Sequence, residues 1–218
     1  MLDLPLSFLH RPADAASAAP WLLVLMHGVG SDEEDLFGLA PHVPPQFHVI
    51  SLRAPYVMGP GAYGWFEFSI NRVGDRIINE AQEVASRAMV AKTVASAAQQ
   101  LGVPPERVVV GGFSQGGIMS LSLLLTRPVL LQAAMVLHSR LLTQVVPLVA
   151  APEALEGKQL WLSHGTHDQV IPLTNAHVIR DLVKTLPIEL SYAEYPSQHE
   201  LIERELVEAM GWLEGLTA

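Results

Sequence analysis

One segment of the sequence has the residue types and spacing expected around a nucleophilic serine. It reads Gly112-Phe113-Ser114-Gln115-Gly116 and follows an apolar run at residues 108–111. A serine hydroxyl is a weak nucleophile and must stand clear of the backbone to reach both a base and a carbonyl carbon. A sharp turn from strand to helix exposes it, and the close approach of the residues two positions before and after it favours glycine there. The segment therefore predicts Ser114 as a catalytic nucleophile.

The same turn predicts a site for the negative charge that forms on a carbonyl oxygen under attack. It places the backbone N–H of Gln115 at the start of a helix, where the partial positive charge favours an oxyanion. A glycine-rich turn for tight packing or phosphate binding remains the alternative. Against phosphate binding, the sequence has neither the lysine of a P-loop nor the glycine spacing of a dinucleotide fingerprint here.

Two later strand ends provide candidates for an acid and a general base. On folds with this strand–serine–helix turn, a triad runs in the order serine, acid, histidine. Asp168 follows the apolar run at residues 159–163 by a short turn, and His199 lies between the last predicted strand and the last predicted helix. His199 would remove the Ser114 proton and later donate it to the leaving group, while Asp168 would orient the imidazole and stabilise its charge.

Other histidines and acids compete for these roles. His164 and His167 lie close to the acid candidate and form an alternative metal cluster with it, although no further convergent ligand is visible and a catalytic zinc needs at least three. His138 follows another strand end, where lining the pocket or supporting the catalytic residues fits better than acting as the base. Asp181 and Glu194 fall within a predicted helix and a predicted strand, which are poor places for the acid.

The second oxyanion donor is expected in the loop after an early strand. The apolar run at residues 22–26 leads into His27-Gly28-Val29-Gly30. The glycines allow the backbone to turn its amides toward the site, so the N–H of Val29 is the predicted partner of the Gln115 N–H. We expect His27 to support this loop by hydrogen bonds rather than to take part in the chemistry.

Short apolar runs alternate with longer helical patterns along the chain. Strands are predicted at residues 6–9, 21–26, 47–52, 108–111, 133–137, 159–163 and 188–192. Helices are predicted to open near Ser31 and to span residues 76–101, 115–125, 173–186 and 200–213. This alternation predicts an α/β fold: a doubly wound, mostly parallel sheet with helices on both faces.

The composition narrows the classes of protein to which the chain can belong. Of its 218 residues, 50% are hydrophobic and 16% charged, and 13 basic against 22 acidic residues give a net charge of −9. The apolar content argues against disorder, and the acidic balance argues against nucleic acid and anionic membranes as partners. The absence of cysteine excludes disulfides, a cysteine nucleophile and thiolate metal sites. The length fits one domain, residues 1–218.

No segment of the sequence has the features of a targeting signal or of a membrane-spanning helix. The start, Met1-Leu2-Asp3-Leu4-Pro5, lacks a basic region, and Pro20 interrupts the longest apolar stretch, residues 18–26. That stretch is far shorter than the ~20 residues needed to cross a bilayer. We therefore expect a soluble, cytoplasmic protein with no stable membrane insertion.

Four segments together resemble the phospholipase/carboxylesterase family of α/β-hydrolases, which includes acyl-protein thioesterases and small bacterial esterases. They occur in the family's order and are residues 27–30, 112–117, 164–168 (followed by Val170 and Pro172) and 199–200. The resemblance implies an α/β-hydrolase fold, a Ser114–Asp168–His199 triad and an oxyanion hole from Val29 and Gln115. It also implies hydrolysis of carboxylic esters or thioesters with no cofactor and no metal.

An aromatic segment is expected to contact the substrate. Glycine and proline are concentrated at residues 54–64, a loop too long for a simple turn, and residues 63–68 resemble the family's aromatic loop before the long helix. Trp65 and Phe66 would floor the acyl pocket, with Phe113 next to the serine as a further substrate-binding residue. An ordinary surface loop with buried aromatic side chains is the alternative.

The sequence departs from the family pattern at two places. Gln198 replaces the glycine that usually precedes the histidine, which would stiffen the loop or narrow the cleft. His138-Ser139-Arg140 stands where a small Ser-Gly pair is expected. Arg140 would place a positive charge near the site and favour acidic substrates, unless it is simply solvated.

The expected activity is that of a serine carboxylesterase acting on a small-molecule ester or thioester. The expected substrates include those with short-chain or lysophospholipid acyl groups. The gap between Leu137 and Leu160 leaves little room for a lid, so we expect an open cleft and no large cap domain. Acyl transfer or perhydrolysis on the same triad, and a non-catalytic binding module of the same fold, remain alternatives. The sequence leaves the oligomeric state undetermined.

Overall fold

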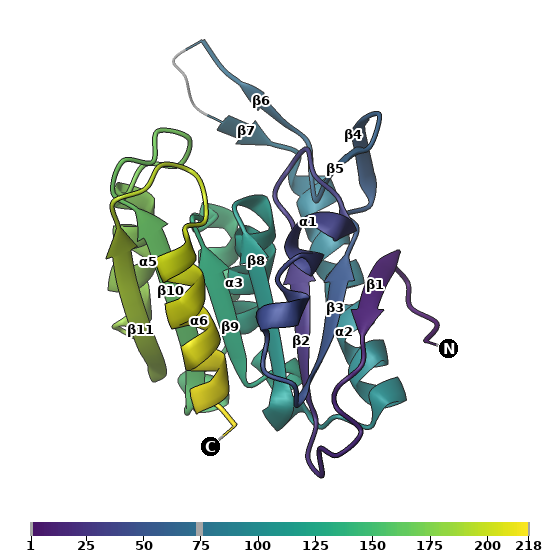
Figure 1. Ribbon diagram of the computed structural model, residues 1–218. Helices are drawn as coiled ribbons and strands as arrows, with labels where there is room; N and C mark the ends of the chain where they lie inside the picture. Colours follow the sequence, from purple (N-terminus) through teal and green to yellow (C-terminus); the bar gives the residue numbers. More distant parts are fainter. Residues whose placement is uncertain (1, 73–75, 218) are drawn as a thin grey trace.

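A central seven-stranded sheet organises the part of the chain that the computed structural model describes, residues 2–72 and 76–217 (Figure 1). The strand order is β1-β3-β2-β8-β9-β10-β11. All neighbouring pairs are parallel except β1 and β3, so the predicted mostly parallel sheet is confirmed. The strands are β1 Phe8–Arg11, β2 Trp21–Met26, β3 Phe47–Leu52, β8 Val108–Phe113, β9 Ala133–Leu137, β10 Lys158–Gly165 and β11 Ile188–Tyr195.

Helices cover both faces of the sheet, which explains why the central strands are apolar on both sides. All five residues of β9 are buried. On one face lie α2 (Glu80–Leu101), α3 (Gln115–Thr126) and α5 (Thr174–Val183), whose apolar side chains share one core cluster with the sheet. On the other face, α1 (Glu33–Phe37) and α6 (Glu203–Gly215) pack against a second cluster.

The long helix begins later than its sequence pattern indicates. The prediction of a helix from residue 76 is wrong, because Arg76–Ile78 form strand β7 and Asn79 caps α2 by accepting a hydrogen bond from the N–H of Gln82. Asparagine is a favoured N-cap residue, and the two isoleucines before it suit a strand. The helix ends at Leu101 because Gly102 adopts a left-handed conformation, with φ of 67°.

The aromatic segment forms two small β-hairpins rather than an irregular loop. β4 (Tyr56–Gly59) pairs with β5 (Ala62–Gly64), and β6 (Phe68–Ile70) pairs with β7. In Figure 1 the β6–β7 hairpin projects beyond the end of the central sheet. This placement puts residues of both of its strands next to the loops that follow the sheet.

The carboxyl ends of the parallel strands meet at one edge, and this edge carries the residues singled out from the sequence. Ser114 directly follows β8, His138 follows β9, and Asp168 lies three residues after β10. Between β9 and β10 the described chain contains a 3₁₀ segment, Thr143–Leu148, and the short helix α4, Pro152–Leu155, but no cap domain. The remaining 3₁₀ segments are Ala40–His42, Pro105–Arg107 and Pro128–Leu130. Within the described ranges, no helix has both the length and the apolar character required to span a membrane.

Candidate active site

Ser114 lies at a strained turn between β8 and α3. Its φ of 54° and ψ of −114° are outside the regions that most residues occupy, and strain of this kind concentrates at functional sites. A Cβ on Gly112 would overlap the backbone of Gly116, and a Cβ on Gly116 would overlap the carbonyl oxygen of Met26. The turn therefore requires both glycines, as its sequence pattern indicates.

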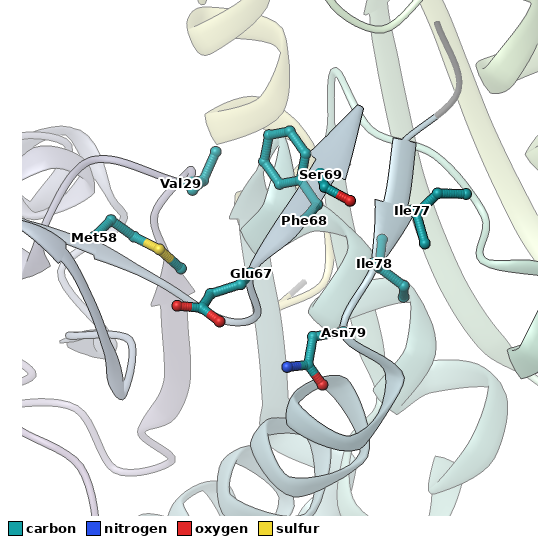
Figure 2. Close-up of a pocket in the computed structure, with 8 residues that line it drawn as sticks. All are labelled: Val29, Met58, Glu67, Phe68, Ser69, Ile77, Ile78 and Asn79. Carbon is teal, nitrogen blue, oxygen red and sulfur yellow. The ribbon is translucent and has the colours of Figure 1, made fainter. Parts of the chain in front are cut away.

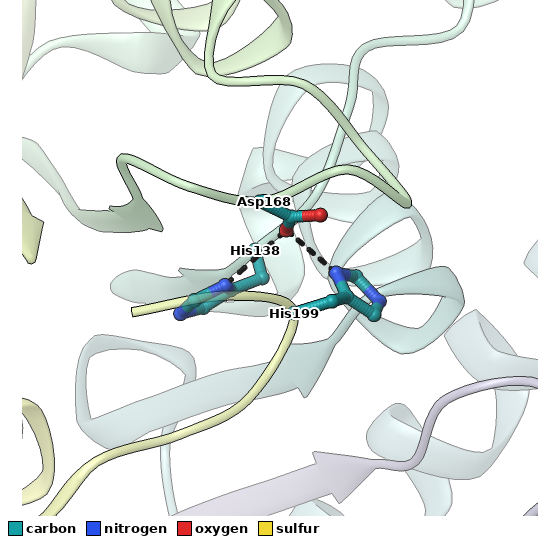
Figure 3. A group of neighbouring side chains, drawn as sticks. All are labelled: His138, Asp168 and His199. Atoms are coloured by element: carbon teal, nitrogen blue, oxygen red, sulfur yellow. Dashed lines mark hydrogen bonds and ion pairs between the residues drawn. The ribbon is translucent and has the colours of Figure 1, made fainter. Parts of the chain in front are cut away.

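Hydrogen bonds connect Ser114, His199 and Asp168, which come from three distant segments. The Ser114 hydroxyl lies 2.9 Å from Nε2 of His199, and Nδ1 of the same ring lies 2.6 Å from Oδ2 of Asp168. A carboxylate can only accept, so Nδ1–H donates to Asp168 and leaves Nε2 free to accept the serine proton. Figure 3 shows the imidazole of His199 turned with one nitrogen toward Asp168.

Asp168 is buried and held by backbone donors as well as by the imidazole. Its Oδ1 accepts hydrogen bonds from the N–H groups of Val170 and Ile171 at 2.9 and 2.8 Å. Burial alone would raise the pKa of this carboxyl group, but the hydrogen bond from His199 and those backbone donors lower the pKa below its ordinary value. The side chain is therefore anionic at neutral pH and fixed in one orientation.

The environment of His199 favours the neutral imidazole. Burial is the largest influence and lowers the pKa of His199, and the nearby His138 and Arg76 act in the same direction. Asp168 opposes them by stabilising the charged ring, yet the net shift is downward. A neutral ring with a free Nε2 is the form that can act as a general base.

Two buried residues, His138 and Glu205, support Asp168. Glu205 is not among the residues predicted from the sequence. His138 has Nδ1 3.4 Å from Oδ2 of Asp168 and Nε2 3.2 Å from Oε2 of Glu205 (Figure 3 shows the first pair). Oε1 of Glu205 accepts a hydrogen bond of 2.6 Å from Ser163. All these side chains are buried, and His138 takes an unusual positive φ of 47°. His138 thus contacts Asp168 from within the buried interior and does not line the cleft.

Glu205 lies in α6 and is not among the residues selected from the sequence. It is fully buried on the same face as Ala209 and Leu213, which follow it at four-residue intervals. That spacing is the signal in the sequence that indicates burial of Glu205. A glutamate is nevertheless expected to be exposed unless a buried partner is known.

The two backbone donors of the predicted oxyanion hole flank the serine. Within the described residues, neither the N–H of Val29 nor that of Gln115 donates to a protein acceptor. A Cβ on Gly28 would lie 3.5 Å from Cβ of Ser114, so the Val29 loop passes close to the nucleophile. Both donors are therefore free to bind an incoming oxygen.

Buried hydrogen bonds hold this loop in place. Nδ1 of His27 lies 2.7 Å from the carbonyl oxygen of Gly28, and its Nε2 accepts from the N–H of Ala54 at 3.1 Å. The indole N–H of Trp65 donates to the carbonyl oxygen of His27 at 2.9 Å. The side chain of Gln115 bonds the N–H of Trp65 and the carbonyl oxygen of Phe66, both at 2.7 Å. His27 thus supports the loop and lies outside the hydrogen-bonded chain at Ser114.

The three aromatic residues expected at the substrate differ in their surroundings. Phe66 lines a small pocket that also contains Ser114. The ring of Phe113 packs against His199, with 4.8 Å between ring centroids. Trp65 is fully buried beneath the Val29 loop, so its contribution to the pocket is indirect, through Phe66 and the loop.

A larger hollow of about 610 Å³ lies beside this small pocket, on the far side of Phe68. Figure 2 shows Val29 and Met58 on one side of it and residues of the β6–β7 hairpin on the other. Val29 and Phe68 border both spaces and are 39% and 37% exposed. The hollow is open, and these two side chains lie between it and the pocket that contains Ser114.

His164 and His167 do not converge on a metal site with Asp168. Nε2 of His164 lies 3.5 Å from Oδ2 of Asp168, but it donates to the carbonyl oxygen of Ile171 at 2.7 Å, and His167 is exposed. In the described part of the chain, the histidine and carboxylate atoms with metal-compatible spacing are those of His138, Asp168 and His199. The hydrogen bonds of Asp168 and His199 already account for that group.

Comparisons with known proteins identify the family of this chain. Residues 11–216 match the model of the phospholipase/carboxylesterase family. A stretch of 97 residues is 35% identical to acyl-protein thioesterase 1 of Neurospora crassa, covering 44% of this chain and 40% of that protein. The chain thus spans less than half the length of this curated relative.

Solved structures match over nearly the whole chain. The crystal structure of esterase PE8 superposes with a TM-score of 0.78 at 27% identity and covers 97% of this chain and 99% of its own. A carboxylesterase from Mesorhizobium loti gives a TM-score of 0.82 at 22% identity, with 99% and 97% covered. These structures confirm the α/β-hydrolase fold.

Proposed function

The chain belongs to the phospholipase/carboxylesterase family, and from this premise we propose that it is a serine hydrolase of carboxylic esters and thioesters. In this proposal Ser114 is the nucleophile, His199 the general base and Asp168 the residue that orients the imidazole. The observation that carries it is the continuous hydrogen-bonded chain from Ser114 through His199 to Asp168. Its similarity to an acyl-protein thioesterase supports including thioesters among the substrates.

The first half of the reaction forms an acyl-enzyme. The Ser114 oxygen attacks the carbonyl carbon as its proton passes to Nε2 of His199, and the N–H groups of Val29 and Gln115 bind the resulting oxyanion. Collapse of this intermediate breaks the bond to the leaving alcohol or thiol, which takes the proton from His199. Asp168 stabilises the imidazolium between these two transfers.

The second half uses water in place of the alcohol. His199 takes a proton from a water molecule while the water oxygen attacks the acyl carbon. The N–H groups of Val29 and Gln115 bind the second oxyanion. The bond to Ser114 then breaks, the serine oxygen recovers its proton from His199, and the carboxylic acid leaves. In this proposal, both water and the acyl group enter from the hollow in Figure 2, which shares Val29 and Phe68 with the pocket at Ser114.

A panel of p-nitrophenyl esters and acyl thioesters of graded length tests the proposal. We expect turnover by the wild type, none by Ser114→Ala, and labelling of Ser114 by a fluorophosphonate probe. Ser120→Ala is a matched control, because the Ser120 hydroxyl lies in the helix that follows Ser114 and donates a hydrogen bond to the carbonyl oxygen of Gly116. Turnover that survives Ser114→Ala, or a folded wild type that neither turns over nor reacts with the probe, would contradict the proposal.

A further inference from the structure

Two arginine side chains share a small pocket with Ser114. The pocket has a volume of about 20 Å³, and Arg76 and Arg140 line it together with Ser114 and Gln115. Its other walls are apolar and come from Val29, Phe66, Phe68, Ile118 and Ile171. Two positive charges beside a nucleophile contrast with a chain whose net charge is −9.

The backbone turn that carries Arg140 is tied to the nucleophile. It follows Ser139, whose hydroxyl donates a 2.8 Å hydrogen bond to the carbonyl oxygen of Ser114, so its turn is tied to the nucleophile's own backbone. The guanidinium is half-buried, and within the described part of the chain its Nε is buried without a hydrogen-bond partner. Burial lowers the pKa of Arg140, and the neighbouring charge of Arg76 lowers it further.

Arg76 reaches the same pocket from the β6–β7 hairpin. Its guanidinium lies over the ring of Phe68, 5.1 Å from the ring centroid, which is the geometry of a cation–π contact. Among the described residues, no carboxylate forms an ion pair with Arg76 or Arg140. Two like charges that face each other without an acid are unfavourable in a partly buried site, and a bound anion would relieve this cost.

We propose that Arg140 and Arg76 form a subsite for a carboxylate on the substrate, so that the preferred substrates are half-esters or half-thioesters of dicarboxylic acids. This inference rests on the proposed function, because it takes Ser114 as the residue that attacks the ester. A planar guanidinium binds a carboxylate through two parallel hydrogen bonds, and the apolar walls suit the methylene groups between the two acyl ends.

Matched pairs of esters measure this preference. The half-esters are p-nitrophenyl hydrogen glutarate and p-nitrophenyl hydrogen adipate, and p-nitrophenyl pentanoate and hexanoate replace the carboxylate with a methyl group. The charge preference is kcat/KM for the half-ester divided by kcat/KM for its uncharged match, with rates in Ser114→Ala subtracted as background. We expect a charge preference above one in the wild type.

Arginine variants assign the preference to the subsite. Arg140→Gln should lower the charge preference by roughly tenfold to a hundredfold, the loss expected for a charged hydrogen-bonded pair. The charge preference of Arg140→Lys should lie between those of the wild type and Arg140→Gln, because lysine keeps the positive charge but cannot form two parallel hydrogen bonds. Arg76→Gln, on the projecting hairpin, provides a second test that does not disturb the turn after β9. Arg127→Gln is the control, because Arg127 is exposed at the far end of α3 and should leave the preference unchanged.

A binding measurement separates failure of this inference from failure of the proposed function. Glutarate should slow fluorophosphonate labelling of Ser114 in the wild type but not in Arg140→Gln, and the uncharged glutaramide should slow neither. Cleavage of the uncharged esters through Ser114 with a charge preference of one or less would overturn the carboxylate subsite alone. The same holds if Arg140→Gln and Arg76→Gln both keep the wild-type preference. Absence of turnover and of labelling in the folded chain would overturn the hydrolase proposal, and the subsite with it.

Discussion

The ionisation of His199 controls when Ser114 can be activated. Burial, together with the nearby His138 and Arg76, lowers the pKa of His199, so the neutral ring persists below the ordinary histidine pKa of about 6.5. We therefore expect kcat/KM for an uncharged ester to stay constant as pH falls through that value and to decline only at lower pH. A pH profile of wild-type kcat/KM checks this, and a decline centred above the ordinary histidine pKa would contradict it.

Asp168 should matter through orientation as well as charge. In Asp168→Asn the amide can donate to Nδ1, which favours the tautomer whose Nε2 carries the proton and cannot accept one from Ser114. By analogy with serine-protease triads, we expect kcat to fall by about ten-thousandfold with little change in the free energy of unfolding. Glu194→Gln is the control, because Glu194 bonds His177 and Tyr192 away from the site. A larger loss in Glu194→Gln than in Asp168→Asn would mean that the acid is misassigned.

His138 is expected to position Asp168 and to influence the pKa of His199. Asn tolerates the positive φ at this position, so His138→Asn should fold and remove the imidazole that faces Asp168 and Glu205. His138 lowers the pKa of His199, so removal of its imidazole should move the acid limb of the kcat/KM profile to higher pH. Asp168 and Arg76 also face His199 and are unchanged in this variant. A lower kcat with an unshifted acid limb would indicate a purely structural role.

Among the elements, the turn between β8 and α3 has the least tolerance for added atoms. A Cβ on Gly116 would overlap the carbonyl oxygen of Met26 in β2, so Gly116→Ala must displace either the serine turn or a central strand. We expect loss of turnover and a lower free energy of unfolding in urea. Gly211→Ala is the matched control, because nothing lies within 4 Å of the added methyl group. It lies within α6 and should stabilise the protein by about 0.4–1 kcal/mol.

The elements that the sequence predicts well are those whose pattern depends on local burial. The strands at Trp21–Met26, Phe47–Leu52 and Ala133–Leu137 have the predicted bounds, because both of their faces are buried and their apolar runs are continuous. The start of α2 was wrong because residues 76–78 fit a helical rhythm, and only their pairing with β6 shows that they form a strand. Such pairing is a non-local contact, which a single sequence pattern does not contain.

The same contrast between local patterns and non-local contacts explains which residues of the candidate site could be predicted. Ser114, Asp168 and His199 could be selected because each follows a predicted strand, and parallel strands bring their carboxyl ends together. Glu205 could not be selected in this way, because its partners His138 and Ser163 belong to other elements. Arg76 was missed for the related reason that its hairpin was read as helix.

On the scale of the whole molecule, the acidic net charge opposes the proposed carboxylate subsite. A chain with a net charge of −9 repels an anionic substrate at long range, while Arg76 and Arg140 attract it at short range. Salt separates these effects, because the screening length falls from about 30 Å at 0.01 M to about 8 Å at 0.15 M. Long-range repulsion is therefore lost first.

The double variant Arg76→Gln/Arg140→Gln keeps the repulsion and removes the local attraction. The charge preference of both proteins should therefore rise with salt between 0.01 and 0.15 M, and it should stay lower in the double variant than in the wild type at every salt concentration. The uncharged esters control for effects of salt on folding and chemistry, because neither charge effect acts on them. A charge preference that is equal in the two proteins throughout this range would mean that the two arginines contribute no local attraction, and that the carboxylate is not held beside Ser114.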